Sequence, residues 1–553
     1  MTSESKIMTL SPSKSAFKGH DFNSEETQIL AALSICILFF GVGVPVWWKT
    51  TNVYRADLPY HEISKLHGER QMTVQIFVDV INENTPVNCN TFTKNLNHLL
   101  NDENMNQTSV GVVYKVTCHD ERETAKVNKV NHIYIIFTNN DERGYGLRLT
   151  TKREVICSIS DEKSGDSEVL ELVQSTLTSL IRDVMVRESI LKELVSNIHQ
   201  ERKDFSHDQE MMKMIQGNLK FDILFSLLCP EPNVQVAEWN IEEADDLYLK
   251  AMLEKVEPVF DFNVGSQTLY YTLIPYAPKV KKDNSNNVEY HYLTHNQLSL
   301  VINPIEGRLG SQVSADPTLN FVVYVTEKKF QPLYIQKNDK NLSQSNTFLI
   351  PRWGALMFYN MNDTFDVEGN SYKKGIVDTN TIMKPFLNHL RALMGIQNPK
   401  PHLSKLNVML HQLNYDGIAD WELDYLIRLR TLERIASATH TLNSLYDLLS
   451  KISNIVINDN IAEEVYKATE TAAKAKALLA TGDLSEALNI SKISFKSSET
   501  AFFDPTLLEL LYFPEDQKFA IYVPLFLPIS LPVFVSLVYT IRRLKNAKKS
   551  KTD

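Results

Sequence analysis

The residues of this chain that could carry out chemistry are few, and none has the partners that a reaction needs. Cys118 and His119, the types that a cysteine protease uses as nucleophile and base, are neighbours in the sequence. In caspase-type enzymes the two groups come from separated segments, and no Gln-Ala-Cys-x-Gly string is present. His61-Glu62 begins like a zinc-binding His-Glu-x-x-His helix, but Lys65 stands in place of the second histidine. Neither pair predicts a catalytic or metal site.

Three aspartates, Asp416, Asp420 and Asp424, recur at the spacing that places side chains on one face of a helix. Acidic groups are favourable at a helix N-terminus, so a solvated first turn explains them without a ligand. The sequence also lacks G-x-S-x-G, Walker A, G-x-G-x-x-G and Cys-x-x-Cys strings. We therefore expect no catalytic, cofactor-binding or metal-binding residue, and no cofactor.

The elements that carry these residues lie between two hydrophobic runs. The last run, residues 519–541, has Tyr522 and Tyr539 as its only ionisable side chains. At ~1.5 Å per residue, a helix of this length crosses the ~30 Å hydrocarbon core of a bilayer. Acidic residues precede the run and a basic tail, residues 542–553, follows it, which places the C-terminus in the cytosol.

The first run, residues 29–48, is also uncharged and long enough to span a bilayer. A secretory signal peptide is the alternative interpretation. However, Glu25 and Glu26 stand where a signal peptide has basic residues, and Trp47-Trp48-Lys49 replaces the small-residue cleavage site. We therefore expect a retained anchor, with both termini cytosolic and residues 49–518 lumenal or exoplasmic.

The predicted lumenal region carries marks that fit this side of the membrane. Four Asn-x-Ser/Thr sequons are candidate glycosylation sites, at Asn106, Asn341, Asn362 and Asn489. Cys36 falls in the first membrane run, and the other four cysteines, which could pair in three ways, are Cys89, Cys118, Cys157 and Cys229. Whether one pair forms a disulfide stays open, because a region this large can be stable without one.

Hydrophobic periodicity predicts a mixed α/β fold for the lumenal region. Four β-branched runs (73–81, 110–118, 132–138 and 154–159) precede a long helical stretch at 167–216. A second unit then alternates strands with helices, with strands expected at 221–228, 268–277, 320–325, 332–336 and 355–360, and helices at 240–255 and 379–395.

Residues 420–502 are helical in pattern throughout, with an apolar stripe formed by Leu432, Ile435, Leu442, Leu449 and Ile452. The stripe either closes the core of a helical arm or is partly a partner surface. The predicted fold is thus an α/β region of sheets flanked by helices plus a helical arm, bounded by one transmembrane helix at each end. Its parts are a cytosolic tail (1–28), a membrane helix (29–48), two lumenal lobes (49–220 and 221–400), the arm (401–518), a second membrane helix (519–541) and a basic cytosolic tail (542–553).

Two further features have both a structural and a functional interpretation. Pro524, Pro528 and Pro532 recur every four residues in the last run, so they share one helix face and leave backbone carbonyls without their usual donors. They form either a kinked span shielded by neighbouring helices or the wall of a lipid or substrate opening. The string at 301–312, with an Asn-Pro pair and two glycines, predicts a loop.

The net charge of -10 provides no basic field for nucleic acid, so nucleic acid is not an expected partner. The positive charge is concentrated in the tail after residue 541, where it faces the anionic lipids of a cytosolic leaflet.

Five stretches of the chain resemble the PIG-S family, a subunit family of the glycosylphosphatidylinositol (GPI) transamidase. They are PVWWKTTNVYRADLPY (45–60), LVINPIEGRLGS (300–311), PRWG (351–354), LLSKISNIVINDNIAEEVYKA (448–468) and AFFDPTLLELLYFPEDQKFAIYVPLFLPISLPV (501–533). The resemblance implies a non-catalytic scaffold subunit in the endoplasmic reticulum membrane, which supports replacement of a precursor's C-terminal signal by a GPI anchor.

The same resemblance implies that the catalytic Cys and His belong to another subunit, PIG-K. The implied partners are PIG-K, PIG-T, PIG-U, the GPI attachment subunit and the lipid bilayer, with the GPI lipid or the precursor protein as further contacts. Lys549 and Lys551 look like a K-x-K-x-x retrieval signal for the endoplasmic reticulum. A two-anchor receptor or tether, and a lumenal enzyme with an unrecognised site, remain as alternatives.

Overall fold

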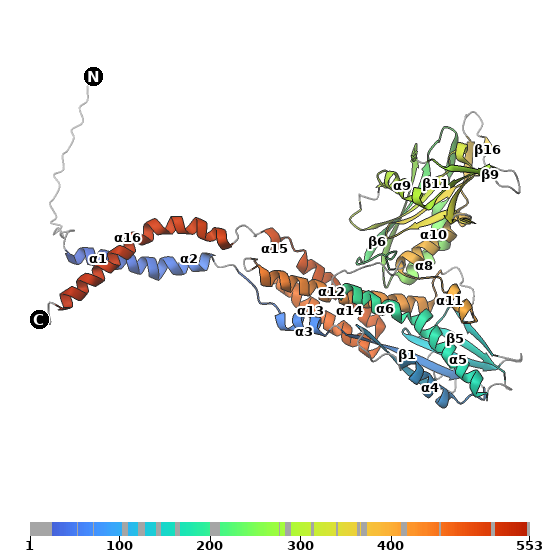
Figure 1. Cartoon of the computed structure of the whole chain (residues 1–553), viewed down its shortest axis with the longest axis horizontal. Coiled ribbons are helices and arrows are strands. Elements are labelled where there is room, and N and C mark those ends of the chain that lie inside the picture. The colour runs from blue at the N-terminus through green and yellow to red at the C-terminus, as the bar shows by residue number, and fades with distance from the viewer. Residues whose placement is uncertain are drawn as a thin grey trace, which may run out of the picture. The chain divides into compact units, whose positions relative to one another are not determined.

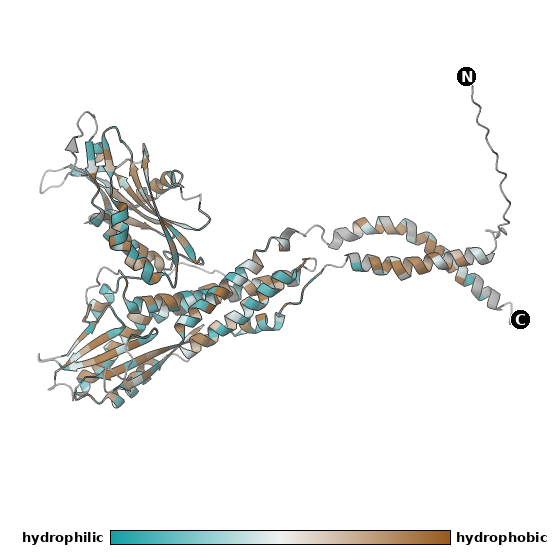
Figure 2. Cartoon of the chain, turned by 180° about the vertical axis from the view of Figure 1, so that it is seen from behind, coloured by the Kyte–Doolittle hydropathy of each residue, from teal (hydrophilic) through white to brown (hydrophobic). Residues whose placement is uncertain are grey.

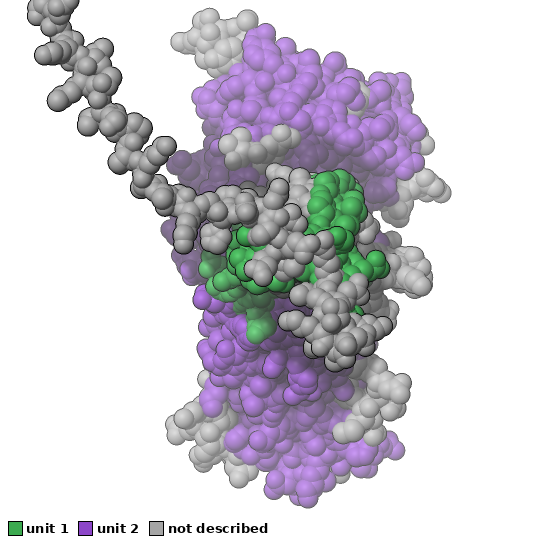
Figure 3. Space-filling model, turned by 90° about the vertical axis from the view of Figure 1, so that its left-hand side faces the viewer, with its two compact units in different colours: residues 1–57, 448–462, 503–553 green, residues 58–447, 463–502 purple. Residues whose placement is uncertain are grey.

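The computed structural model describes residues 25–549 except for 52–53, 70, 84, 102–108, 120–127, 140–144, 161–165, 200–210, 276, 283–288, 311–313, 339–340, 362–364, 367–372, 411–416, 453–454 and 510–514. The chain divides into two compact units (Figure 3). Unit 1 comprises residues 1–57, 448–462 and 503–553, and unit 2 comprises residues 58–447 and 463–502.

Unit 1 contains the two hydrophobic runs, which are helical and mostly apolar (Figure 2). The first run forms α1 (Glu25–Leu38), the π-helical turn η1 (Phe39–Gly43) and α2 (Val44–Thr51), and the last forms α16 (Glu515–Lys549) after the short α15 (Thr506–Glu509). α1 packs against α16. The chain after α2 is fastened to the loop at residue 457, because the Ala56 amide donates to the Ile457 carbonyl at 3.0 Å and the Tyr54 hydroxyl to Asp459 at 2.7 Å.

The helices of the described residues include no single one that is long and apolar enough to cross a membrane. Two halves of α16, Ala520–Pro528 and Ser530–Arg542, are together long and apolar enough to cross a membrane, but they are bent by 46° relative to each other. Leu33–Val46 is a shorter apolar helix.

Unit 2 contains a six-stranded sheet in the order β18-β4-β5-β3-β1-β2. Its strands are β1 (Met72–Asn82), β2 (Val110–His119), β3 (His132–Asn139), β4 (Tyr145–Leu149), β5 (Glu154–Ile159) and β18 (Val408–Leu410). β2, β1, β3 and β5 are parallel; burial alternates along the first half of β1, and five consecutive residues of the central β3 are buried. The helices that accompany this sheet are α3 (Tyr60–Gly68), α4 (Cys89–Asn101), α5 (Ser167–Ser179), η2 (Leu180–Val186) and α6 (Glu188–His199).

A second sheet has the order β14-β15-β11-β6-β8, formed by β6 (Lys220–Cys229), β8 (Asp261–Tyr270), β11 (Thr318–Val325), β14 (Thr347–Ile350) and β15 (Gly354–Tyr359). Alternate residues of β6 and β11 belong to two different apolar clusters, so the sheet is covered on both faces. One face packs on α7 (Ile241–Ala244), η3 (Asp245–Leu249), α8 (Lys250–Val256) and α10 (Thr379–Met394), and the other on α9 (His295–Glu306).

Shorter strands complete this part of unit 2. A four-stranded sheet, β13-β12-β10-β9, is formed by β9 (Lys279–Lys282), β10 (Glu289–Leu293), β12 (Leu333–Asn338) and β13 (Asn341–Leu342), and the 3-10 turn η5 (Lys328–Phe330) precedes β12. A three-stranded sheet, β16-β17-β7, is formed by β7 (Gln235–Glu238), β16 (Phe365–Asp366) and β17 (Lys373–Ile376). The mixed α/β prediction is therefore confirmed.

The helical C-terminal region is also confirmed. After α11 (Lys400–Lys405), the long helices α12 (Asp420–Lys451), α13 (Asp459–Thr481) and α14 (Leu484–Phe502) follow one another, as Figure 1 shows. Leu432, Ile435, Leu442 and Leu449 of the predicted stripe are buried. The stripe thus contributes to the core of the chain, as its apolar spacing indicates.

Two local predictions were wrong. The string at 301–312 is helical as far as Glu306, because α9 continues through Asn303-Pro304, and its last two residues, 311–312, lie outside the described ones. A capping box between Thr294 and Gln297 fixes the N-terminus of α9. Burial of Leu298, Val301 and Ile305 against the second sheet outweighs the missing amide donor of the proline. The strand expected at 268–277 is β8, which begins at Asp261 and ends at Tyr270.

Candidate functional site

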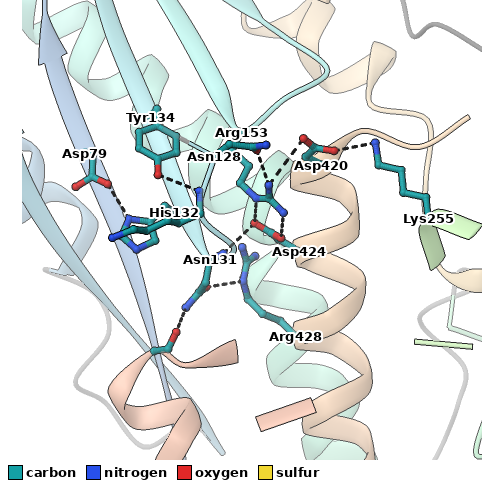
Figure 4. A network of polar contacts seen from close by, with 12 residues as sticks. Asp79, Asn128, Asn131, His132, Tyr134, Arg153, Lys255, Asp420, Asp424 and Arg428 are labelled. Carbon is teal, nitrogen blue, oxygen red and sulfur yellow. Dashed lines mark hydrogen bonds and ion pairs between the residues drawn. The ribbon is translucent and has the colours of Figure 1, made fainter. Parts of the chain in front are cut away.

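The polar contacts between the first sheet and α12 form a network of charged and amide side chains (Figure 4). Asp424 of α12 accepts two hydrogen bonds from Arg153, which precedes β5, at 2.7 Å from Nε and 2.8 Å from Nη2. Burial alone would lower the pKa of Arg153, but the hydrogen bonds and charge of Asp424 outweigh burial and raise this pKa. The pair is therefore charged and satisfied.

The prediction of a solvated aspartate face was wrong for Asp424, whose side chain is 1% exposed. Asp420 is 20% exposed and accepts a 2.7 Å ion pair from Lys255 of α8, and Asp416 lies outside the described residues. The third acidic group of this turn, Glu422, pairs with Arg391 of α10 at 2.7 Å. The start of α12 is thus bonded both to the first sheet, through Arg153, and to helices that pack on the second sheet, through Lys255 and Arg391.

Asn131 extends the network toward the turn between α13 and α14. Its side-chain amide donates to the carbonyls of Gln75 at 2.8 Å and Gly482 at 2.9 Å, and its oxygen accepts from Arg428 at 3.2 Å. Gly482 has a φ of +89°, and a Cβ there would lie 2.5 Å from the Phe77 ring. Only glycine fits this contact without displacing the ring.

The same face of the first sheet carries an Asp–His cluster. Asp79 of β1 lies 2.7 Å from His132 Nδ1, 3.3 Å from His119 Nε2 and 2.5 Å from the Thr117 hydroxyl, which donates to it. Burial would raise the pKa of Asp79, but the hydrogen bonds from His132 and Thr117, together with the charge effect of His132, outweigh burial and lower this pKa.

This cluster does not have the geometry of a catalytic triad. A triad histidine uses one ring nitrogen for the aspartate and the other for the nucleophile. Here Nε2 of His119 faces both Asp79 and the Thr117 hydroxyl, at 3.3 and 3.4 Å, so His119 cannot take a proton from the hydroxyl while the aspartate orients its other nitrogen. His132 bonds to Asp79 through Nδ1, and the described contacts of this side chain include no hydroxyl or thiol.

The cysteines offer no nucleophile either. Cys118 is bonded to Cys89 in a disulfide that joins the end of β2 to the start of α4, whereas Cys157 and Cys229 do not pair. Cys157 and Cys229 are buried thiols; burial raises the pKa of Cys157 to about 12 and also raises that of Cys229. Because the thiolate is the reactive form, both are inert at neutral pH.

The other predicted site residues lie apart from this network. Asn489 is exposed on α14, whereas the Ser491 hydroxyl of its sequon is buried and donates to Leu488; Asn341 begins β13, and Asn106 and Asn362 lie outside the described residues. Pro524, Pro528 and Pro532 are exposed within α16. Lys549 ends α16 and Lys551 lies outside the described residues. Within the described ranges, no group of three or more His, Cys, Asp or Glu side chains could hold a metal ion.

Sequence reasoning missed Arg153, Asn131, Glu422 and Arg391. Asp424 and Arg153 are 271 residues apart, so no local spacing indicates that they meet. The one available signal was the run of charges in residues 420–434, a helix whose apolar stripe already required burial.

Comparison with known proteins shows that the chain is similar to a family of proteins over nearly its whole length. The family model of the phosphatidylinositol-glycan biosynthesis class S protein, PIG-S, matches residues 34–547. The human protein named GPI-anchor transamidase component PIGS is 34% identical over 95% of this chain and 97% of its own length. The rat protein of the same name is 34% identical over 92% of this chain and 94% of its own length. The Saccharomyces cerevisiae protein named GPI transamidase component GPI17 is 22% identical over 93% of this chain and 92% of its own length. Because the family model covers nearly the whole chain, this chain belongs to the PIG-S family.

Proposed function

We propose that this chain is a non-catalytic scaffold subunit of the GPI transamidase, which replaces the C-terminal signal of a precursor by a GPI anchor. The observation that carries the proposal is the match to proteins named as components of this transamidase over more than nine-tenths of both chains. The geometry of the described cysteines and of the Asp79 cluster supports the non-catalytic part, because no thiolate lies beside an oriented base.

In this proposal the reacting Cys and His are supplied by PIG-K, and the chain assembles with PIG-K, PIG-T, PIG-U and the GPI attachment subunit. The scaffold role is supported by the first turn of α12, whose carboxylates Asp420, Glu422 and Asp424 each pair with a cation from another element. Removing one partner of such a pair is costly where the pair is buried, so these contacts tie α12 to the elements that supply the cations.

The proposed location is the endoplasmic reticulum membrane, with two spans at 29–48 and 519–541 and both termini cytosolic. The lumenal lobes are 49–220 and 221–400, and the helical arm is 401–518. The bent apolar pair in α16 and the packing of α1 against α16 support two neighbouring spans. Lys549 and Lys551 would then serve as a cytosolic retrieval signal, and the sequons at Asn106, Asn341, Asn362 and Asn489 would be accessible to glycosylation.

The experiment that tests the proposal is single substitution of each candidate reacting group in cells that lack the natural chain. Cys89, Cys118, Cys157 and Cys229 are replaced by Ser, His119 by Ala and Asp79 by Asn. Transamidation is then measured per amount of assembled complex, and we expect it to be unchanged, since losses act through stability and assembly. A true nucleophile would lose on the order of 10⁴ to 10⁶ in rate. Loss of transamidation by one of these variants in a fully assembled complex would show that the chain is catalytic.

If the chain were instead recovered alone in mild detergent, without the other transamidase components, this result would favour the interpretation as a two-anchor receptor or tether. Turnover by the isolated chain would favour the lumenal enzyme.

A further inference from the structure

The outer edge of β8 is a long strand edge that no described strand covers. β8 is the terminal strand of the five-stranded sheet and pairs with β6 along its full length, from Lys220–Asp261 to Cys229–Tyr270. The Asp261 amide donates to the Leu219 carbonyl, and the Tyr271 amide donates to the Cys229 carbonyl, both at 2.9 Å. Because backbone groups alternate along a strand, odd-numbered residues of β8 face β6.

The even-numbered residues therefore direct their N–H and C=O groups away from the sheet. They are Phe262, Val264, Ser266, Thr268 and Tyr270, and their backbone groups bond to no other described residue. Such a row is a template for an added strand, and natural proteins normally protect it with short length, lysine, proline or a covering side chain.

The other sheet edges of the described chain carry these protections. The strands β7, β9, β13, β14, β16 and β18 are at most four residues long, and three of the four residues in β9 are lysines. β2 is as long as β8, but the Asn101 side chain accepts from the Tyr114 amide at 3.0 Å and donates to the Tyr114 carbonyl at 3.1 Å. That side chain occupies the position of a neighbouring strand.

β8 has none of these devices. It contains no lysine or proline, and its single charged residue, Asp261, is already paired with Lys220 of β6 at 2.9 Å. The side chains of Ser266 and Thr268 are exposed and neutral, and the edge leads into Tyr270, Tyr271 and Leu273, which are 49%, 64% and 48% exposed. The edge therefore suits an extended neutral segment that is small or polar beside Thr268 and apolar beside Tyr271.

We infer that the outer edge of β8 takes an extended, uncharged segment of another component of the transamidase as an additional strand. The inference rests on the proposed function, since an assembly of different components supplies such a segment. Main-chain hydrogen bonds give this mode its affinity, and the alternating side chains give its specificity.

The test is amide hydrogen exchange on the full chain, compared between the complex assembled in mild detergent and the chain purified alone. We expect the outward amides of β8 to exchange about tenfold more slowly, or slower still, in the complex, since each gains a hydrogen bond. The inward amides of β8 and those of β6 should be protected in both samples.

A matched set of variants links this protection to assembly. Thr268→Pro removes an outward amide without removing a hydrogen bond to β6, and Ser266→Lys adds a charge to the same edge. We expect either variant to lower the recovery of assembled complex about tenfold, with the unfolding midpoint of the chain alone unchanged. Leu300→Lys is the control, because it adds the same charge at a 68% exposed position of α9 away from the edge.

Each result decides between interpretations. Equal exchange of the outward amides in the two samples would overturn the inference while co-purification left the proposed function standing. Slow exchange in the chain alone would also overturn it, since a segment of this chain or a second copy would then cover the edge. Failure of the wild-type chain to co-purify with the other components would overturn the proposed function, and this inference with it.

Discussion

The Asp424 carboxylate, 1% exposed, and the Arg153 guanidinium, 7% exposed, form a buried ion pair at 2.7 Å. We expect Asp424→Asn to lower the free energy of unfolding by about 3 kcal/mol, because it removes the nearest counter-charge of a buried guanidinium and leaves only Asp420, at 3.8 Å. A urea titration of the detergent-solubilised chain measures this change.

The exposed Asp447 of the same helix is the control, and Asp447→Asn should change stability by less than about 0.5 kcal/mol. Replacing both partners, with Arg153→Met and Asp424→Leu, should restore part of the lost stability, since the buried guanidinium of Arg153 is removed, while Arg428 and the Asn131 amide still lose Asp424. A single variant as stable as the wild type would show that water already solvates the pair.

Cys157 should resist alkylation in the folded chain. Its pKa is raised to about 12, so at pH 8 only about one thiol in 10⁴ is the reactive thiolate. In a chain with Cys36→Ser and Cys229→Ser, iodoacetamide should modify Cys157 slowly and faster by about tenfold for each unit of pH up to about 11. Denaturation in urea gives the reference rate, and rapid labelling of the folded chain at pH 8 would contradict the burial of this thiol.

At the scale of elements, the prolines of α16 accompany a 46° bend between its two apolar halves. Replacing Pro524, Pro528 and Pro532 together by Leu should restore the amide donors and straighten the helix, while leucine keeps it apolar enough to insert. We expect the amount of assembled complex to fall, measured by co-purification, with membrane insertion unchanged.

The control changes three neighbouring positions and keeps the prolines, with Val523→Leu, Leu527→Val and Leu531→Val. If the proline variant assembled as well as this control, the prolines would serve only to bend a span that other helices shield.

Most elements could be predicted from the sequence because their apolar residues repeat at the period of a helix or a strand. The sheet strands at 73–81 and 320–325 and the helices of residues 420–502 are of this kind. The predicted position of β8 was wrong because an edge strand exposes polar side chains. Its first residues, Asp261 to Gln267, therefore show little of the apolar alternation that predicts a strand. α9 was missed because tertiary burial of Val301 and Ile305 overrides the local signal of Asn303-Pro304.

The candidate site was less predictable than the fold. The missing strings led to the prediction that no nucleophile and base pair is present, which stays a prediction, whereas the role of the acidic turn of α12 could not be predicted at all. Its partners, Arg153, Lys255 and Arg391, come from three separate segments, and only the folded chain brings them together.

For the whole molecule, the proposed topology predicts which parts are accessible from each side of the membrane. Glycosidase should remove glycans from Asn106, Asn341, Asn362 or Asn489, while protease added outside sealed microsomes should digest residues 1–28 and 542–553. A sequon introduced into residues 1–24 should remain unmodified. Protection of either tail would reverse the orientation argued from the basic C-terminus.

The contacts of the first sheet with α12 and with Gly482 can form only after a long further stretch of the chain has been synthesised. Arg153 leaves the ribosome 271 residues before Asp424, an interval of about 15 to 55 s at ~5 to 20 residues per second. Throughout that interval the half-buried Phe77 ring and the amides around Asn131 lack the surface that later covers them. One side of the first sheet therefore stays uncovered during synthesis until α12 and the turn at Gly482 have been made.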